Sequence, residues 1–155
     1  MIAVSDTSPL NYLILIGEVE LLPKMFSRVV IPSAVRGELC HERTPPIVAA
    51  WVTRLPSWIE IISAGESSVG VALGRGEAEA IAVAQTIAAD VALIDERKAS
   101  LVARQHGLRV TGTLGVLDLA AEKGLVDLNM AVLRLLKTNF RVSHTVVEEL
   151  LSRHR

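Results

Sequence analysis

The sequence predicts a three-layer α/β fold, in which helices cover both faces of a central and mostly parallel sheet. Short apolar segments alternate along the chain with longer helix-like segments, as in a succession of βα units. Half of the residues are hydrophobic but only 3% are aromatic, so the core must consist of Leu, Val, Ile and Ala. This composition favours an α/β fold over a β-sandwich. We expect residues 1–155 to form one domain.

Five segments have the apolar character of strands. Val91–Ile94 is apolar throughout, as expected for a parallel strand that is covered on both faces. The alternation of Trp58–Ile62 is less regular. The predicted strands are residues 2–5, 28–31, 58–62, 91–94 and 108–111.

Turn and capping residues place helices between these strands. Thr7 or Ser8 is expected to cap a helix that begins at Pro9 and ends before Gly17. Ser33 is expected to cap the helix after the second strand. The predicted helices are residues 9–16, 19–26, 33–42, 46–54, 77–87, 97–106, 114–123, 129–137 and 143–152.

Composition excludes several classes of function. The formal net charge is −1, so contact with nucleic acid requires a local basic group. A single cysteine, Cys40, excludes an intramolecular disulfide and a Cys-rich zinc site. The chain has neither a leader pattern nor an apolar run of ~18 residues, so we expect a soluble cytoplasmic protein without membrane contact.

Two aspartates directly follow predicted strands. Asp6 follows residues 2–5, and Asp95 follows residues 91–94. Open α/β folds bind ligands at the carboxyl ends of their strands. If the two strands are neighbours, the carboxylates repel one another, and the arrangement needs a cation or a raised pKa. We therefore expect a divalent cation at this edge of the sheet.

Glutamates on the intervening helices extend this acidic set. Glu38 and Glu77 border the apolar sides of their helices, whereas Glu79 is expected to point to solvent. Ordinary interpretations also exist, because Asp95 could be a helix N-cap and Glu77 a favourable charge in a first turn. The four acids at matching ends of successive βα units are Asp6, Glu38, Glu77 and Asp95.

Carboxylates in this pattern suit a hard cation. Mg²⁺ and Mn²⁺ prefer oxygen ligands, and an ion so held can lower the pKa of a bound water and clamp a phosphodiester. Arg36, Arg97 and Lys98 are the predicted phosphate contacts. Gly74-Arg75-Gly76 lacks the Lys that a P-loop requires, so the sequence does not support an NTPase.

Several segments together resemble the PIN-domain nucleases, and the chain is similar to the VapC-type toxin branch of that family. Their order and spacing agree with the family over residues 1 to about 120. The two terminal helices resemble a PIN-like subfamily. The matching segments are Val4–Leu10, Val30–Leu39, Gly76–Ala84 and Ala92–Arg97.

This resemblance implies a Mg²⁺- or Mn²⁺-dependent ribonuclease, usually dimeric and often inhibited by a cognate protein antitoxin. It implies a PIN-like domain over residues 1–155, with the acidic site in residues 1–125 and two C-terminal helices in residues 126–155. A homodimer through the helices near residues 10–26 and 46–54 is a further expectation from the family. Transferred by motif, the catalytic set is Asp6, Glu38, Glu77 and Asp95, with Ser8 as a supporting hydroxyl.

We expect Asp6, Asp95 and Glu77 to hold the metal, and Glu38 to hold or deprotonate the attacking water. Two departures from the family pattern leave an alternative open. Glu77 stands where many relatives have Asp, and Asp95 is followed by Glu96 and basic residues in place of the family's Asp-Phe pair. The alternative is a catalytically inactive PIN-like module that binds RNA or a partner. Glu79 also remains a candidate for the helix acid.

Overall fold

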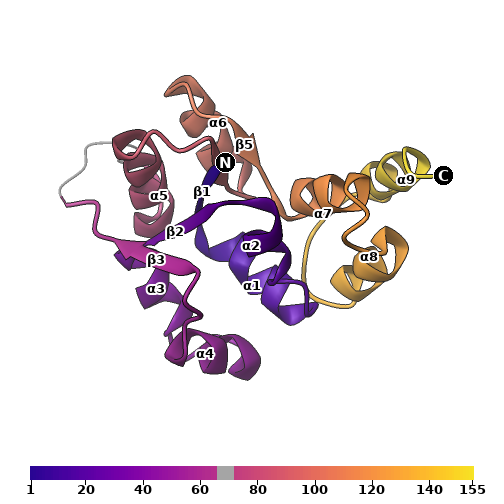
Figure 1. Ribbon diagram of the computed structural model, residues 1–155, viewed down its shortest axis with the longest axis horizontal. Helices are drawn as coiled ribbons and strands as arrows, with labels where there is room; N and C mark the ends of the chain where they lie inside the picture. Colours follow the sequence, from indigo (N-terminus) through magenta and orange to yellow (C-terminus); the bar gives the residue numbers. More distant parts are fainter. Residues whose placement is uncertain (66–71) are drawn as a thin grey trace.

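The computed structural model describes residues 1–65 and 72–155 of the chain. Within these residues five parallel strands form one sheet in the order β3-β2-β1-β4-β5 (Figure 1). The predicted α/β class with a parallel sheet is confirmed. The strands are β1 (Ile2–Ser5), β2 (Arg28–Pro32), β3 (Ile59–Ile62), β4 (Val91–Leu93) and β5 (Val110–Thr111).

The helices of the described residues follow the predicted order, and their boundaries differ from the predicted ones by a few residues. Gly17 and Gly107 adopt positive φ angles after two of the helices, as glycines at helix ends commonly do. The helices are α1 (Thr7–Leu15), α2 (Leu21–Met25), α3 (Ser33–Leu39), α4 (Pro46–Thr53), α5 (Arg75–Thr86), α6 (Arg97–Gln105), α7 (Thr113–Glu122), α8 (Leu128–Leu136) and α9 (His144–Ser152). None of these helices is long and apolar enough to cross a membrane.

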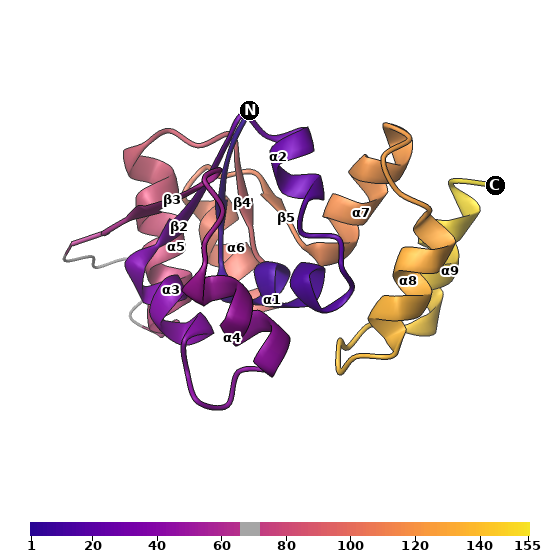
Figure 2. The same ribbon diagram turned by 60° about the horizontal axis from the view of Figure 1, so that its bottom comes forward.

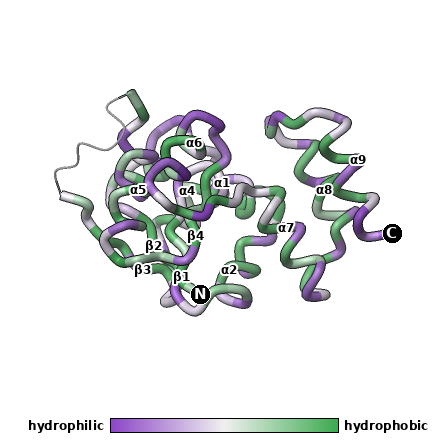
Figure 3. Tube along the Cα trace, turned by 90° about the horizontal axis from the view of Figure 1, so that it is seen from above, coloured by the Kyte–Doolittle hydropathy of each residue, from purple (hydrophilic) through white to green (hydrophobic). Residues whose placement is uncertain are grey.

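Alternating side chains of the strands face two separate apolar layers. Val4 and Ala92 pack with the buried residues of α5 and α6 on one face of the sheet. Ala3 and Leu93 pack on the other face, with the buried residues of α1, α4 and α7 among others. This period of two produces the three layers. In the hydropathy colouring of Figure 3, the strands contain green, hydrophobic stretches.

The strand order places a topological switch point beside β1. The chain passes from β1 to β2 and β3, and then returns to β4 on the other side of β1. Ser5 of β1 pairs with Leu93 of β4, and the Asp6 N–H donates a hydrogen bond to the Leu93 carbonyl at 2.9 Å. In doubly wound sheets such a switch point opens the crevice that binds the ligand.

The two C-terminal helices extend this core at one end of the molecule, beyond α7 (Figure 2). Leu135 of α8 and Leu150 of α9 are buried in the same cluster as Leu93 of the sheet. Arg134 of α8 also lies 3.7 Å from the Glu18 carboxylate. The apolar core therefore continues from the sheet through α7 into α8 and α9.

Candidate active site

A cavity of about 700 Å³ opens at the carboxyl ends of β1 and β4. All four acids predicted from the sequence line this cavity, and a fifth acid joins them. Residues that are far apart in the sequence thus meet at the switch point of the sheet. Among the described residues, the five carboxylates that line it are those of Asp6, Glu38, Glu77, Asp95 and Glu96.

Asp6 is the most deeply buried of these acids, with only 4% of its surface exposed. Its Oδ1 atom is fully buried and has no hydrogen-bond partner among the described residues. Burial raises the pKa of Asp6 to about 7, and the charges of Glu77 and Glu38 contribute to the increase. An ionised Asp6 therefore needs a positive partner in this cavity.

Asp95 is held by three hydrogen bonds from two neighbouring elements. Its Oδ1 accepts from the Thr113 N–H at 2.7 Å, and its Oδ2 accepts from the Thr113 hydroxyl at 2.7 Å and from the Ser8 hydroxyl at 3.0 Å. Asp95 is not the N-cap of α6, because the Glu96 carboxylate accepts hydrogen bonds from the first N–H groups of that helix. Gly112 makes room for Asp95, since a Cβ atom there would lie 2.6 Å from Asp95 Oδ1.

The hydroxyls after Asp6 do not cap α1, which corrects the capping prediction. The N-cap is Asp6, and its side chain makes no capping hydrogen bond. Ser8 donates to Asp95, and the Thr7 hydroxyl donates a short hydrogen bond to Glu38 Oε2. Both hydroxyls therefore face the cavity and bind its carboxylates, and neither binds the backbone of α1.

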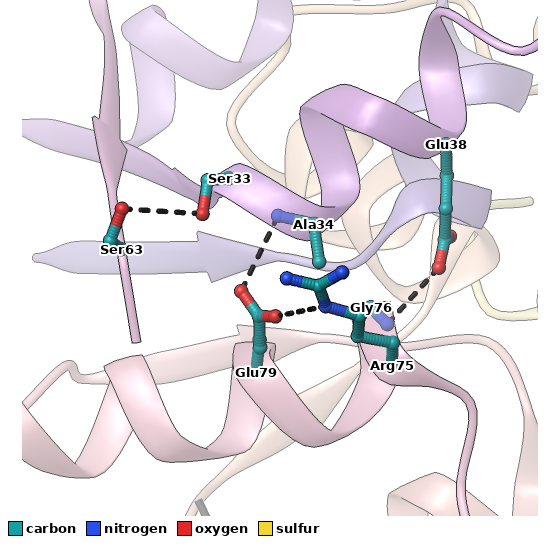
Figure 4. A network of polar contacts seen from close by, with 7 residues as sticks. All are labelled: Ser33, Ala34, Glu38, Ser63, Arg75, Gly76 and Glu79. Carbon is teal, nitrogen blue, oxygen red and sulfur yellow. Dashed lines mark hydrogen bonds and ion pairs between the residues drawn. The ribbon is translucent and has the colours of Figure 1, made fainter. Parts of the chain in front are cut away.

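Glu38 reaches from α3 to the beginning of α5 (Figure 4). Its Oε1 accepts a hydrogen bond from the Gly76 N–H at 3.0 Å. A Cβ atom on Gly76 would lie 2.6 Å from the same oxygen, so any other residue there would force this carboxylate to move. Glu38 is thus positioned jointly by Thr7 and Gly76.

Glu77 lies in the first turn of α5 and faces the cavity. Its Oε1 accepts a hydrogen bond from the N–H of Gly74, the N-cap residue, at 3.0 Å. Burial raises the pKa of Glu77, and the charges of Glu96 and Glu38 add to this effect. Glu77 therefore combines the predicted place in the acidic cavity with its ordinary role at a helix N-terminus.

Glu79 is buried rather than solvent-facing, which corrects the expectation from helical spacing. Its Oε2 accepts from Arg75 Nε at 2.9 Å, and its Oε1 accepts from the Ala34 N–H at 3.3 Å (Figure 4). Ser33, predicted to cap α3, makes no capping hydrogen bond. The Glu79 carboxylate accepts a hydrogen bond from the first turn of that helix instead. Glu79 does not line the acidic cavity.

The predicted phosphate contacts lie outside the cavity. Arg36, Arg97 and Lys98 are exposed, and none of them lines it. Arg141 is the one cation among the described residues that does. The strand-end rule could have identified Thr113, which closely follows the last strand, but no local pattern singles out Arg141.

The donor set fits a divalent cation held largely by water. Among residues 1–65 and 72–155, no three His, Cys, Asp or Glu side chains converge closely enough to form a metal site by themselves. Mg²⁺, however, commonly binds through one or two carboxylates, with waters and substrate oxygens completing its shell. The unpartnered Asp6 Oδ1 beside four further acids suits that mode of binding.

Fold and site together define a parallel α/β domain with an acidic cavity at its switch point. A family model, DUF3368, described as a PIN domain, matches residues 2–155. The chain therefore belongs to this PIN-domain family, whose fold is of a nuclease type. No curated protein and no solved structure matches the chain.

Proposed function

We propose that this protein is a metal-dependent ribonuclease that hydrolyses RNA phosphodiester bonds, and that it is the toxin of a toxin–antitoxin pair. The observation that carries the nuclease proposal is Asp6, a buried carboxylate with an unpartnered oxygen, among four further acids. When it is ionised, such a group is costly unless a cation neutralises it. Membership of the PIN-domain family agrees with this reading.

The acids divide into two roles. Asp6, Asp95 and Glu77 would hold the ion, in part through its bound waters, because they line the cavity from the ends of β1 and β4 and from α5. When bound, Mg²⁺ or Mn²⁺ supplies charge neutralisation for a phosphodiester and lowers the pKa of a coordinated water. Ser8 and Thr113 orient Asp95 through their hydrogen bonds.

Glu38 is the group best suited to handle the proton of the attacking water. It is exposed at the cavity, and each of its oxygens accepts only one hydrogen bond from the described residues, so lone pairs remain available. Its contacts with Thr7 and Gly76 fix the direction of the carboxylate. Glu38 would therefore accept the proton as a general base.

The test is cleavage of a single-stranded RNA oligonucleotide with Mg²⁺, with Mn²⁺ and with a chelator. We expect metal-dependent cleavage, and a loss of about 100-fold or more in the Asp6→Asn and Asp95→Asn proteins. Glu122→Gln, an exposed charge change on α7, is the matched control and should cleave normally. Full activity in both Asp variants would contradict the assignment.

A non-catalytic binding module is the second candidate, and the hydrogen bonds of Asp95 favour it. Three donors already occupy this carboxylate, which reduces its capacity to bind a metal. This candidate predicts that calorimetry detects no Mn²⁺ binding and that Asp6→Asn leaves RNA or partner binding intact. Saturable Mn²⁺ binding that Asp6→Asn abolishes would exclude it.

Partners follow from the same proposal. The gene of a protein antitoxin would lie next to the gene of this chain, and the antitoxin would block RNA cleavage when it is added to the assay.

We also infer a homodimer through α1, α2 and α4, where Ile47 of α4 leaves 57% of its surface exposed. Sedimentation equilibrium of the Ile47→Lys protein tests this interface, and an unchanged dimer would place the contact elsewhere. A cytoplasmic location belongs to the same hypothesis.

A further inference from the structure

One wall of the acidic cavity comes from the segment between α8 and α9. Asn139, Phe140 and Arg141 line the cavity, although they lie far from the acids in sequence. In Figure 1 this orange segment runs from α8 to α9 past the end of α1. The C-terminal helices therefore contribute directly to the surroundings of the acids.

This wall is held in place by Tyr12 of α1. The Tyr12 hydroxyl donates a hydrogen bond to Asn139 Oδ1 at 2.8 Å. The rings of Tyr12 and Phe140 meet edge to face, with centroids 4.9 Å apart and an interplanar angle of 88°. The Phe140 N–H donates to the Thr138 hydroxyl at 3.1 Å, so the segment also has internal support. The wall is preorganised rather than loosely placed.

The wall also carries the positive charge of the cavity. Arg141 is exposed, and it forms no ion pair within the described part of the chain. Its charge reaches Tyr12, because it opposes the rise in the Tyr12 pKa that burial and Asp95 cause. Five carboxylates repel a phosphate in this cavity. Among the described residues that line it, Arg141 is the one whose charge attracts a phosphate.

We propose that Tyr12, Phe140 and Arg141 form a subsite for single-stranded RNA beside the acids. Here an unpaired base stacks on the Phe140 ring, which the edge-to-face contact with Tyr12 holds in place, and Arg141 binds a neighbouring phosphate. Bases stack on aromatic side chains with little sequence preference, and only unpaired bases are free to do so. The chain has one Tyr, two Phe and two Trp, and two of these five aromatic residues line this cavity. The identity of the substrate rests on the proposed function.

The experiment measures binding of a fluorescent single-stranded RNA oligonucleotide by anisotropy over a range of salt concentrations. It uses the full chain carrying Asp6→Asn, in a chelator, so that no cleavage occurs and one buried negative charge is absent. Arg141→Gln, Phe140→Leu and the control Arg104→Gln are compared in this background. Arg104 is an exposed arginine of α6 that lies outside the cavity.

Two different signatures are expected. Arg141→Gln should weaken binding several-fold at low salt and reduce the slope of log Kd against log salt concentration by about 0.7, the value for one phosphate contact on a single strand. Phe140→Leu should weaken binding about fivefold or more without changing the slope, because stacking releases no counterions. Arg104→Gln should behave as the background does.

The subsite is refuted if the background protein fails to bind the RNA, or if Arg141→Gln and Arg104→Gln have the same affinity and slope. Melting temperatures equal to that of the background show that the variants remain folded. Cleavage by the wild-type chain in Mn²⁺ is scored separately. If the wild type does not cleave but Arg141→Gln weakens binding, the subsite stands and the nuclease proposal fails. If the wild type cleaves but Arg141→Gln changes neither the affinity nor the slope, the nuclease proposal stands and the subsite fails.

Discussion

Asp6 has an energetic cost that can be measured in the absence of metal. Its carboxyl group has an ordinary pKa of 3.8, and burial raises this to about 7 in the folded protein. The folded state therefore binds the proton more tightly than the unfolded state does. The stabilising contribution is fully present below pH 3.8 and is lost as the pH rises through about 7. The full loss is about 4 kcal/mol at most.

We expect Asp6→Asn to be more stable than the wild type in a chelator, by a margin that grows between pH 4 and pH 7 and then levels off. Chemical denaturation at a series of pH values measures this margin. Adding Mn²⁺ should reduce it, because the ion stabilises only the wild type. Glu122→Gln should show no such trend. A wild type that is more stable than Asp6→Asn at pH 7.5 without metal would contradict the prediction.

Glu77 and Glu79 are two residues apart on α5 but have different surroundings. Glu77 lines the acidic cavity, whereas Glu79 binds Arg75 and the Ala34 N–H. We expect Glu77→Gln to lower RNA cleavage by about tenfold or more with little effect on stability. Glu79→Gln should keep its cleavage rate and lose about 1 kcal/mol of unfolding free energy, since a partly buried charge-assisted contact is weakened. Cleavage kinetics and denaturation curves separate the two cases. The reverse pattern would assign the helix acid to Glu79.

At the scale of elements, the contact between α3 and α5 positions Glu38. Gly76→Ala would place a methyl group against the Glu38 carboxylate and displace it. Because Glu38 is exposed, its carboxylate can move aside without disturbing the core, and we expect cleavage to fall about tenfold while the melting temperature changes little.

Gly37 of α3 provides a matched control, because a Cβ atom there meets nothing within 4 Å. Gly37→Ala should stabilise the protein by about 0.5–1 kcal/mol through helix propensity and leave cleavage unchanged. Equal cleavage by the two alanine variants would show that the position of Glu38 does not matter for the chemistry.

Local sequence patterns predict the helices, the strands and the acids at the strand ends. They do not predict the hydrogen-bond partners of those acids or the other residues that line the cavity. Asp6 and Asp95 follow apolar strands, so their meeting depended only on β1 and β4 being neighbours. The capping prediction fails for the hydroxyls of Thr7 and Ser8 because their acceptors, Glu38 and Asp95, lie 31 and 87 residues away in sequence. Spacing on α5 likewise could not reveal that α3 covers Glu79. Arg141 enters the cavity only through the packing of α8 and α9.

At the scale of the whole molecule, the predicted single domain depends on the C-terminal helices sharing the core of the sheet. Leu135 of α8 is fully buried in the same cluster as Leu93, whereas Leu133 leaves 56% of its surface exposed. We expect Leu135→Ala to cost about 2–5 kcal/mol and Leu133→Ala about 0.5 kcal/mol or less.

The shape of the unfolding transition tests whether the chain forms one domain. If α8 and α9 belong to one cooperative unit with the sheet, Leu135→Ala lowers a single unfolding transition, and amides of β1 and α8 lose hydrogen-exchange protection together. A separate early transition that exposes only α8 and α9 would instead make these helices an independent unit. Because Tyr12 and Asn139 tie the loop after α8 to the acidic cavity, this second outcome would also loosen the wall of the proposed RNA subsite while the sheet stays folded.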